Sequence, residues 1–422
     1  MKHIIDILKE FPQISDYKIS ETQITTYETF FVHEKLETVR ATSTTEKSVT
    51  VYVQHDGKLG DSVFAVYSST TDQDLRNKIE LAIQKAQLVN NQPYVLPAKE
   101  QLVDEIYSNM SEYEPKELAC QIAKACFDAN SEQNGSINAL EIFINKIRFH
   151  VVNSNGLDKC EQKYTAMVEA IPTWTDGESV ELYECYNFST FSYDSVKAEI
   201  ASKMQEVKDR YFATKPQVCP NCKVVLNAPE IVSLLGDIVG ELGFGSVYSH
   251  SNAFSKGDNL QNGDCDKLTI TLRGQIEGSH RNSLFDGDGV TLVDTVVVKD
   301  GVAINYHGGN RFGQYLGEKI TGNLPCMQVD AGSICEQDIA KEPYFECVSM
   351  SGLQVDIYND YIGGEVRLAY YFDGTKKVAL TGISISGKLS EALATLRLSN
   401  KIVTHNSYRG PHKAVFGKIS VI

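Results

Sequence analysis

Two carboxylates four residues apart, Asp237 and Glu241, have the spacing in this sequence that most directly suggests metal chemistry. On a helix such side chains share one face, and together they could hold a hard cation. Further ligands could come from five of the nine histidines, which are His250, His280, His307, His405 and His412. Carboxylates at this spacing are more often a solvated or interface face, so a metal site at Asp237 and Glu241 is an alternative interpretation.

The cysteines offer a second candidate site. Cys219 and Cys222 form the one tight pair in a chain with 10 cysteines. Such a C-x-x-C pair can be redox-active or half of a zinc knuckle, but a knuckle needs a second pair, and no other Cys or His pair has the required spacing. The pair therefore predicts a plain loop, and a redox or metal role stays open.

The helix that carries the two carboxylates is predicted from Asn227 onward. Asn227 can cap the helix, Pro229 suits its first turn, and Glu230 can reach back to the cap. An apolar stripe follows at helical spacing, comprising Ile231, Leu234, Leu235, Ile238, Val239 and Leu242. Gly236 and Gly240 lie on the remaining face, where each costs about 1 kcal/mol relative to Ala. Their presence suggests either a close approach to the helix or a function that has been lost.

This segment resembles the central helix of the TldD/PmbA family, whose peptidase members carry a His-Glu-x-x-x-His motif after a paired Leu and behind a strand of the type VVL. Val224-Val225-Leu226 matches that strand and Leu234-Leu235 matches the leucine pair. The resemblance places Gly236 at the first His, Asp237 at the general-base Glu, and Glu241 at the second His. The strand and the leucine pair of the family are present, whereas the two His residues that bind zinc are not.

Four further segments resemble the family in the same order along nearly the whole chain. HDGKLGDSVFAVY (55–67) resembles its Gly-rich hairpin, and Asn153-Ser154-Asn155-Gly156 resembles its Asn-Ser-x-Gly turn. Residues 283–307 resemble its Phe-Asp-x-x-Gly-Val hairpin, and ISGKL (385–389) resembles the segment before its last helix. Each motif is weak alone, and their shared order is the stronger argument.

The departures from the family pattern decide the expected function. A catalytic zinc site needs three protein ligands, and glycine has no side-chain donor. The peptidase members also use a Cys near the C-terminus, whereas no Cys follows Cys347 in this sequence. The resemblance therefore implies the PmbA-like, or TldE-like, branch, the non-catalytic companion of a TldD-like metallopeptidase.

This branch implies a chain without catalytic or metal-binding residues and without a cofactor of its own. Zinc would reside in a TldD-like partner of a heterodimer, or the chain would form a homodimer, around a chamber for extended peptides. Two alternatives remain. One is an active hydrolase with a relocated metal at Asp237 and Glu241, and the other is a stand-alone homodimeric peptide-binding pseudoenzyme.

Composition narrows the partners and the location. The 422 residues include 40 Lys plus Arg against 55 Asp plus Glu, a formal charge of -15 that opposes a phosphate backbone. We therefore expect no direct nucleic-acid contact, despite the gyrase-modulator name attached to the family. No apolar run is long enough to span a membrane, and the first residues lack a secretory pattern, so we expect a cytoplasmic protein.

The pattern of elements predicts an α+β fold with largely antiparallel sheet. Antiparallel hairpins are expected at 49–67, 136–171 and 291–307, and strands at 23–41, 268–274, 346–358, 364–372 and 377–386. Helices are expected from Thr71 and over 115–129, 194–213, 310–318 and 389–398. We expect domains at 1–95, 96–215 with the long helix, and 216–422, the last being β-rich. FDGDGV (285–290) lacks the spacing of a calcium loop and predicts a tight turn.

Overall fold

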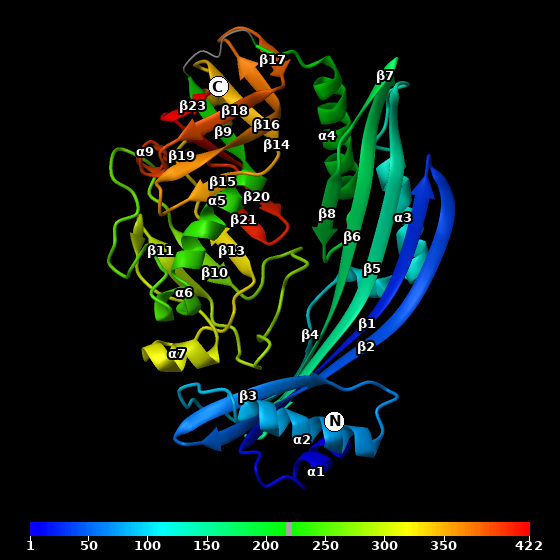
Figure 1. Cartoon of the computed structure of the whole chain (residues 1–422). Coiled ribbons are helices and arrows are strands. Elements are labelled where there is room, and N and C mark those ends of the chain that lie inside the picture. The colour runs from blue at the N-terminus through cyan, green and yellow to red at the C-terminus, as the bar shows by residue number, and fades with distance from the viewer. Residues whose placement is uncertain (217–221) are drawn as a thin grey trace.

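Four long strands form the framework of the first half of the chain in the computed structural model, which describes residues 1–216 and 222–422 (Figure 1). They are β1 (Asp16–Val32), β2 (Lys35–His55), β5 (Gly135–Asn153) and β6 (Asp158–Asp176). Thr, Tyr, Val, Ile and Phe, which favour extended backbone, are frequent in them. They pair antiparallel in the order β2-β1-β5-β6. The sheet is completed by β3 (Lys58–Ala65), β4 (Gln101–Glu105), β7 (Glu178–Glu181) and β8 (Glu184–Phe188).

The pairing of β1 with β5 joins the first two predicted domains in one sheet, from Lys18 opposite Asn153 to Val32 opposite Ala139. A boundary between residues 95 and 96 stays a prediction.

Two-residue turns connect β1, β2 and β3, the three strands at one edge of this sheet. Asp56 and Gly57, at φ 48° and 72°, join β2 to β3, and this confirms the hairpin predicted at 49–67. His33 and Glu34, at φ 46° and 64°, join β1 to β2. Neither His nor Glu is typical of such a turn. The segment 23–41, predicted as strand, therefore contains a chain reversal whose position the residue types do not indicate.

Helices α1 (Lys2–Leu8) and α2 (Asp72–Ala86) cover one end of the sheet (Figure 1). A capping box begins α2, because Thr71 Oγ1 accepts the Asp74 N–H at 3.1 Å and Asp74 Oδ2 accepts the Thr71 N–H at 3.2 Å. The buried residues of α2 repeat at helical spacing and are Leu75, Ile79, Ala82, Ile83 and Ala86. The predicted helix is thus confirmed.

The other end of the sheet is covered by the short 3₁₀ helix η1 (Asn109–Glu112), α3 (Pro115–Phe127) and α4 (Tyr193–Phe212). Helices α3 and α4 pack against each other and against β5 and β6. The apolar stripe of α4 is buried at Val196, Ile200, Met204 and Val207, while Tyr211 is half-buried. This leaves the charged face of α4 directed away from the apolar core.

Two further sheets make up the C-terminal half. One has the order β19-β22-β9-β14-β16-β18-β23 with β15 and β17 on β16, and the other has the order β12-β11-β10-β13-β21-β20. The strands of the first are β9 (Lys223–Asn227), β14 (Tyr344–Met350), β15 (Gln354–Asp356), β16 (Tyr361–Phe372), β17 (Lys377–Leu380), β18 (Ile383–Gly387), β19 (Arg397–Leu398), β22 (Lys413–Phe416) and β23 (Ile419–Val421). Those of the second are β10 (Ile270–Arg273), β11 (Thr295–Lys299), β12 (Val302–Ala303), β13 (Cys326–Val329), β20 (Ile402–His405) and β21 (Tyr408–Pro411).

Five helices accompany these sheets in the described part of the chain. They are α5 (Ala228–Glu241), α6 (Phe244–Tyr248), α7 (Asn310–Leu316), α8 (Glu336–Ile339) and α9 (Leu389–Ala394). Most strand pairs are antiparallel, whereas β9 with β14, β13 with β21, and β4 with β6 are parallel. The predicted α+β class is confirmed. Among the described residues, no helix combines the length and apolar character that crossing a lipid bilayer would need.

The loop at 285–290 is a tight turn, as predicted. Asp286 Oδ1 accepts the N–H groups of Asp288 at 2.9 Å and Val290 at 3.1 Å, and Gly289 adopts φ 84°. The Asp286 carboxylate is therefore used by the backbone of its own loop.

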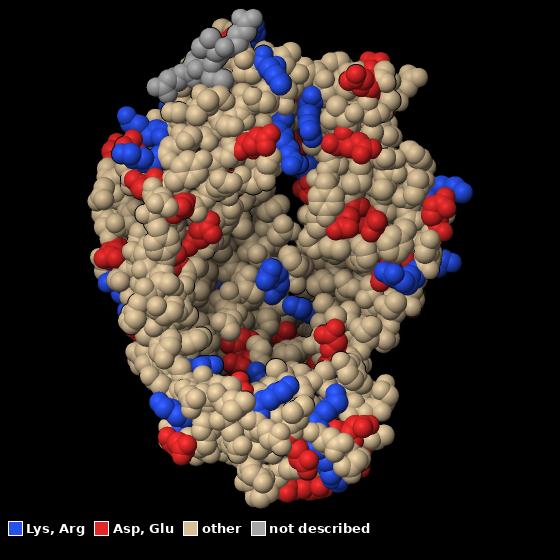
Figure 2. Space-filling view, viewed as in Figure 1, with Lys and Arg blue, Asp and Glu red and all other residues tan. Residues whose placement is uncertain are grey.

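The two halves of the molecule touch at both ends and leave a hollow between them (Figures 1 and 2). At one end, Tyr370 of β16 donates its hydroxyl to Asp209 of α4, and Thr214 N–H donates to Ala379 O at 3.2 Å. At the other end, Val95 N–H donates to Gln314 of α7 at 3.0 Å, and Arg311 donates to Asn91 at 2.6 Å. The hollow is bounded by the long sheet and α4 on one side and the C-terminal half on the other.

We predict that Gly60→Ala destabilises the contact of β3 with the end of α2. A Cβ at Gly60 would lie 1.7 Å from Ala86 O and 2.9 Å from Val89 O, both backbone atoms. We expect a loss of about 3 kcal/mol in the free energy of unfolding, measured by urea denaturation. Val63→Ala on the same strand is the control, because Val63 is exposed. Equal stability of Gly60→Ala and the wild type would contradict this packing.

Candidate functional site

Helix α5 is held by its apolar stripe in the core of the C-terminal half. Ile231, Leu234, Leu235 and Ile238 are at most 1% exposed and pack with residues of both C-terminal sheets. Burial of such side chains stabilises the fold by about 2 kcal/mol each, so the stripe fixes the rotation of the helix. The positions of the sequence motif consequently lie on the other face.

The predicted cap of α5 is only partly correct. Asn227 is the N-cap residue, but its side chain makes no capping hydrogen bond. Its Nδ2 instead donates to Cys347 O at 3.3 Å, on the neighbouring strand β14. Packing against that strand has replaced the local cap that the sequence suggested.

Gly236 and Gly240 lie on the exposed face of α5. A Cβ at either position would meet no atom within 4 Å. The possibility that a close approach requires these glycines is therefore wrong for the isolated chain. Gly236, at the position of the first His, leaves an open stretch of helix surface without a side-chain donor.

Asp237 and Glu241 differ in their surroundings. Asp237 lies on the exposed face of the helix. Its carboxyl is nevertheless partly shielded from water, and this shielding, together with the neighbouring Glu241 charge, raises its pKa. Glu241 Oε2 accepts the Ala253 N–H at 2.5 Å and the Tyr358 hydroxyl at 2.9 Å. At the position of the second His, the chain thus has a carboxylate that anchors a loop.

The candidate histidines do not join these carboxylates. His307 packs under the end of α5, where its Nε2 donates to Val239 O at 3.1 Å and burial lowers its pKa. The others lie at separate places, with His250 exposed, His280 half-buried, His405 beside Asn406 and His412 beside Glu336. Across residues 1–216 and 222–422, no group of three His, Cys, Asp or Glu side chains is placed to hold a metal ion.

The residues at the motif positions do not fit zinc. Gly236 supplies no donor, and Glu241 is committed to two hydrogen bonds. Cys219 lies outside the described residues, so the prediction for the Cys219–Cys222 pair is not addressed by the structure.

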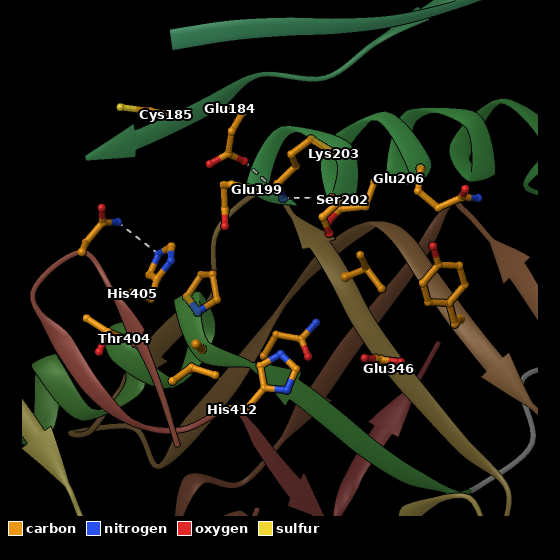
Figure 3. A pocket seen from close by; sticks show the side chains of 18 residues that line it. Glu184, Cys185, Glu199, Ser202, Lys203, Glu206, Glu346, Thr404, His405 and His412 are labelled. Carbon is orange, nitrogen blue, oxygen red and sulfur yellow. Dashed lines mark hydrogen bonds and ion pairs between the residues drawn. The ribbon is translucent and has the colours of Figure 1, made fainter. Parts of the chain in front are cut away.

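A cavity of about 650 Å³ opens at the N-terminal end of α5, between α4 and β8 on one side and the C-terminal sheets on the other (Figure 3). The first turn of α5 contributes Asn227, Ala228 and Pro229 to its wall. The labelled side chains in Figure 3 are Glu184, Cys185, Glu199, Ser202, Lys203, Glu206, Glu346, Thr404, His405 and His412. The cavity is therefore formed by both halves of the molecule.

Ion pairs organise most of the charges around this cavity. Lys203 Nζ lies 2.9 Å from Glu206 and 3.3 Å from Glu184. Glu346 accepts from Lys413 at 2.5 Å and from Lys377 at 3.2 Å, and these lysines lower its pKa against the effect of burial. The sequence predicts α4 only as a helix over 194–213, although the spacing of Glu199, Lys203 and Glu206 is typical of a charged helix face.

Two carboxyls at the cavity are shifted toward the neutral form. Burial and the charge of Glu184 raise the pKa of Glu199 to about 7. Burial raises the pKa of Glu230, which follows the cavity-lining turn of α5, to about 7. Glu230 Oε2 has no hydrogen-bond partner among the described residues.

The C-terminal half of the chain matches a known protein family. Residues 220–422 match the PmbA/TldA metallopeptidase C-terminal domain. These residues belong to the PmbA/TldD family. No curated protein sequence matches the chain.

Several solved structures share the fold of the whole chain. TldE from Thermococcus kodakarensis is similar with a TM-score of 0.80 and 15% identity, covering 100% of this chain and 99% of that protein. A proposed DNA gyrase modulator from Thermotoga maritima has a TM-score of 0.80 and 14% identity, with coverages of 100% and 99%. Another from Bacteroides thetaiotaomicron has a TM-score of 0.79 and 13% identity, with coverages of 100% and 97%. At these identities the likeness concerns the fold.

We predict that Gly236→Ala and Gly240→Ala each stabilise the chain. Both positions lie inside a helix with open space around them, so alanine removes the helix-propensity penalty without a clash. The expected gain is about 1 kcal/mol per substitution in urea denaturation. Gly313→Ala in α7 is the matched control and should destabilise, because its Cβ would lie 2.7 Å from Ile320 Cγ1. Destabilisation by both α5 substitutions would contradict the open surface.

We predict that Glu230→Gln changes the pH dependence of stability. The pKa of Glu230 is about 7 in the folded chain against 4.5 for the unfolded group, so its stabilising effect is complete below about pH 4.5 and is lost as pH rises through 7. Gln cannot ionise and should stabilise the chain by up to about 3 kcal/mol at about pH 8, with little effect near pH 4.

The measurement is thermal or urea unfolding at both pH values, with Glu178→Gln as control, since Glu178 is exposed on β7. A Glu230→Gln effect that is the same at both pH values would contradict the assignment of a neutral, buried carboxyl.

Proposed function

We propose that this chain is a non-catalytic, TldE-like companion subunit of a TldD-type zinc metallopeptidase that degrades small unstructured peptides. One observation carries the proposal. Helix α5 keeps its buried stripe and position behind β9, while Gly236 has no donor and Glu241 is bonded to Ala253 and Tyr358. A peptidase of this chain's own would need three ligands and an open coordination position.

The partner we propose is a homologue with the intact His-Glu-x-x-x-His helix, which would hold the zinc. An unpaired strand edge supports association with another chain. Residues 48–55 of β2 pair with β3, but residues 35–47 pair only with β1 among the described strands. Leu36 and Val39 on this stretch are 48% and 46% exposed. Such an edge is a template for another strand.

An extended peptide is the substrate class we propose for the complex. The hollow between the two halves and the cavity at the start of α5 are lined by backbone and polar side chains that an extended chain can contact. The formal charge of -15 argues against direct nucleic-acid binding. We place this activity in the cytoplasm.

The pairing is tested by mixing the purified chain with a homologue that carries the intact motif. Native mass spectrometry should show a one-to-one complex, and cleavage of an unstructured peptide should appear only in the mixture. A partner with its motif Glu replaced by Gln is the control and should form the complex without cleavage.

Two outcomes would overturn the proposal. Cleavage by this chain alone, abolished by Asp237→Ala with Glu241→Ala, would favour the relocated metal site. A stable homodimer that binds peptide and ignores every motif-bearing homologue would favour the stand-alone pseudoenzyme.

A further inference from the structure

We propose that the cavity between α4 and the C-terminal sheets binds an organic cation, the primary ammonium group of an alkyl chain such as a lysine side chain. The site consists of residues of this chain, so it does not depend on the proposed zinc-bearing partner. Figure 3 shows Glu184, Glu199 and Lys203 on one side of the cavity and His405, His412 and Glu346 on the other.

The cavity has more negative groups than its own cations neutralise. Lys377 and Lys413 both bind Glu346, which leaves Lys203 as the cation for the remaining carboxylates. Lys203 bridges Glu184 and Glu206. Glu199 then has no hydrogen bond or ion pair within the described residues, and it faces the charges of Glu184 and Glu206 as well as Lys203.

Neutral acceptors without donors lie in the same wall. Asn227 Oδ1 and Asn406 Oδ1 are buried and have no partner among the described residues. Their amide nitrogens are already used, since Asn227 Nδ2 donates to Cys347 O at 3.3 Å and Asn406 Nδ2 lies 3.1 Å from His405 Nε2. Buried polar atoms are nearly always hydrogen-bonded, so these oxygens indicate a missing donor.

Glu230 adds a third acceptor of this kind immediately behind the wall. It is only 9% exposed, and its Oε2 has no partner in the described chain. The charges of Lys203 and Glu206, which line the cavity, both act on its carboxyl. Residues with oxygens that lack donors therefore line the cavity from α4, from the start of α5 and from the β20–β21 turn, with Glu230 behind them.

The geometry favours an ammonium group over a metal ion. No three acidic, His or Cys side chains in the described chain converge closely enough to coordinate a metal. An ammonium group has three N–H donors that point in different directions, which suits acceptors spread over separate elements. A volume of about 650 Å³ also leaves room for the chain that bears the ammonium group.

Few positive charges of the chain itself compete with a ligand cation in this cavity. Burial, and then the nearby Lys203, lower the pKa of His405, which disfavours the charged form of this imidazole. A bound ammonium would favour the ionised form of Glu199, whose pKa of about 7 in the free chain allows either form.

The test is isothermal titration of the isolated full-length chain with acetyl-Gly-Lys-Gly-amide at about pH 8, where Glu199 is mostly ionised. The norleucine peptide of the same length is the matched ligand control, and butylamine distinguishes a free amine from a peptide side chain. We expect saturable binding of the lysine peptide and none of the norleucine peptide. Butylamine binding of equal strength would support an ammonium site and would indicate that its ligand is a free amine.

Glu199→Gln should weaken binding by about tenfold, because a hydrogen bond to a charged group is lost. Glu178→Gln on the exposed strand β7 should leave it unchanged. Asn406→Ala gives a second test that does not rely on Glu199, with a several-fold loss expected. Absence of saturable binding, equal binding of the norleucine peptide, or unchanged binding in both cavity variants would overturn the proposal.

Discussion

Burial of the apolar stripe of α5 is the constraint on which the rest of the site depends. The stripe packs between the two C-terminal sheets, so the helix can neither rotate nor shift without exposing Leu234, Leu235 and Ile238. None of the motif positions contributes to that packing, since Gly236 and Asp237 are exposed. The packing of α5 therefore places no requirement on the residues at these exposed positions.

A similar division between a buried apolar face and a polar face explains why the charged side chains of α4 lie at the cavity. Helix α4 lies beside the long strands at the wall of the hollow. Its buried stripe faces the first sheet while its charged face meets the C-terminal half. Lys203, Glu206 and Glu199 are thereby brought to the first turn of α5 and the turn after β20. Burial there is only partly compensated by ion pairs, which leaves acceptors that need a donor from outside the chain.

Local signals predicted much of the fold. The capping box at Thr71, the Asp56-Gly57 turn and the stripes of α2, α4 and α5 each depend on residues close in sequence. The turn at His33 and Glu34 has no such signal, and the pairing of β1 with β5 joins residues more than 100 positions apart. The cavity was missed for the same reason, because Glu199, Asn227 and Asn406 converge only through the fold.

The most direct test of the central claim is the zinc content of the isolated chain after equilibration with zinc and desalting, measured by plasma mass spectrometry. We predict no stoichiometric zinc in the wild type, and the same result for Asp237→Ala with Glu241→Ala. One zinc per chain that is lost in this double variant would show that the helix has a rebuilt metal site, and would contradict the claim that α5 has lost its metal-binding face.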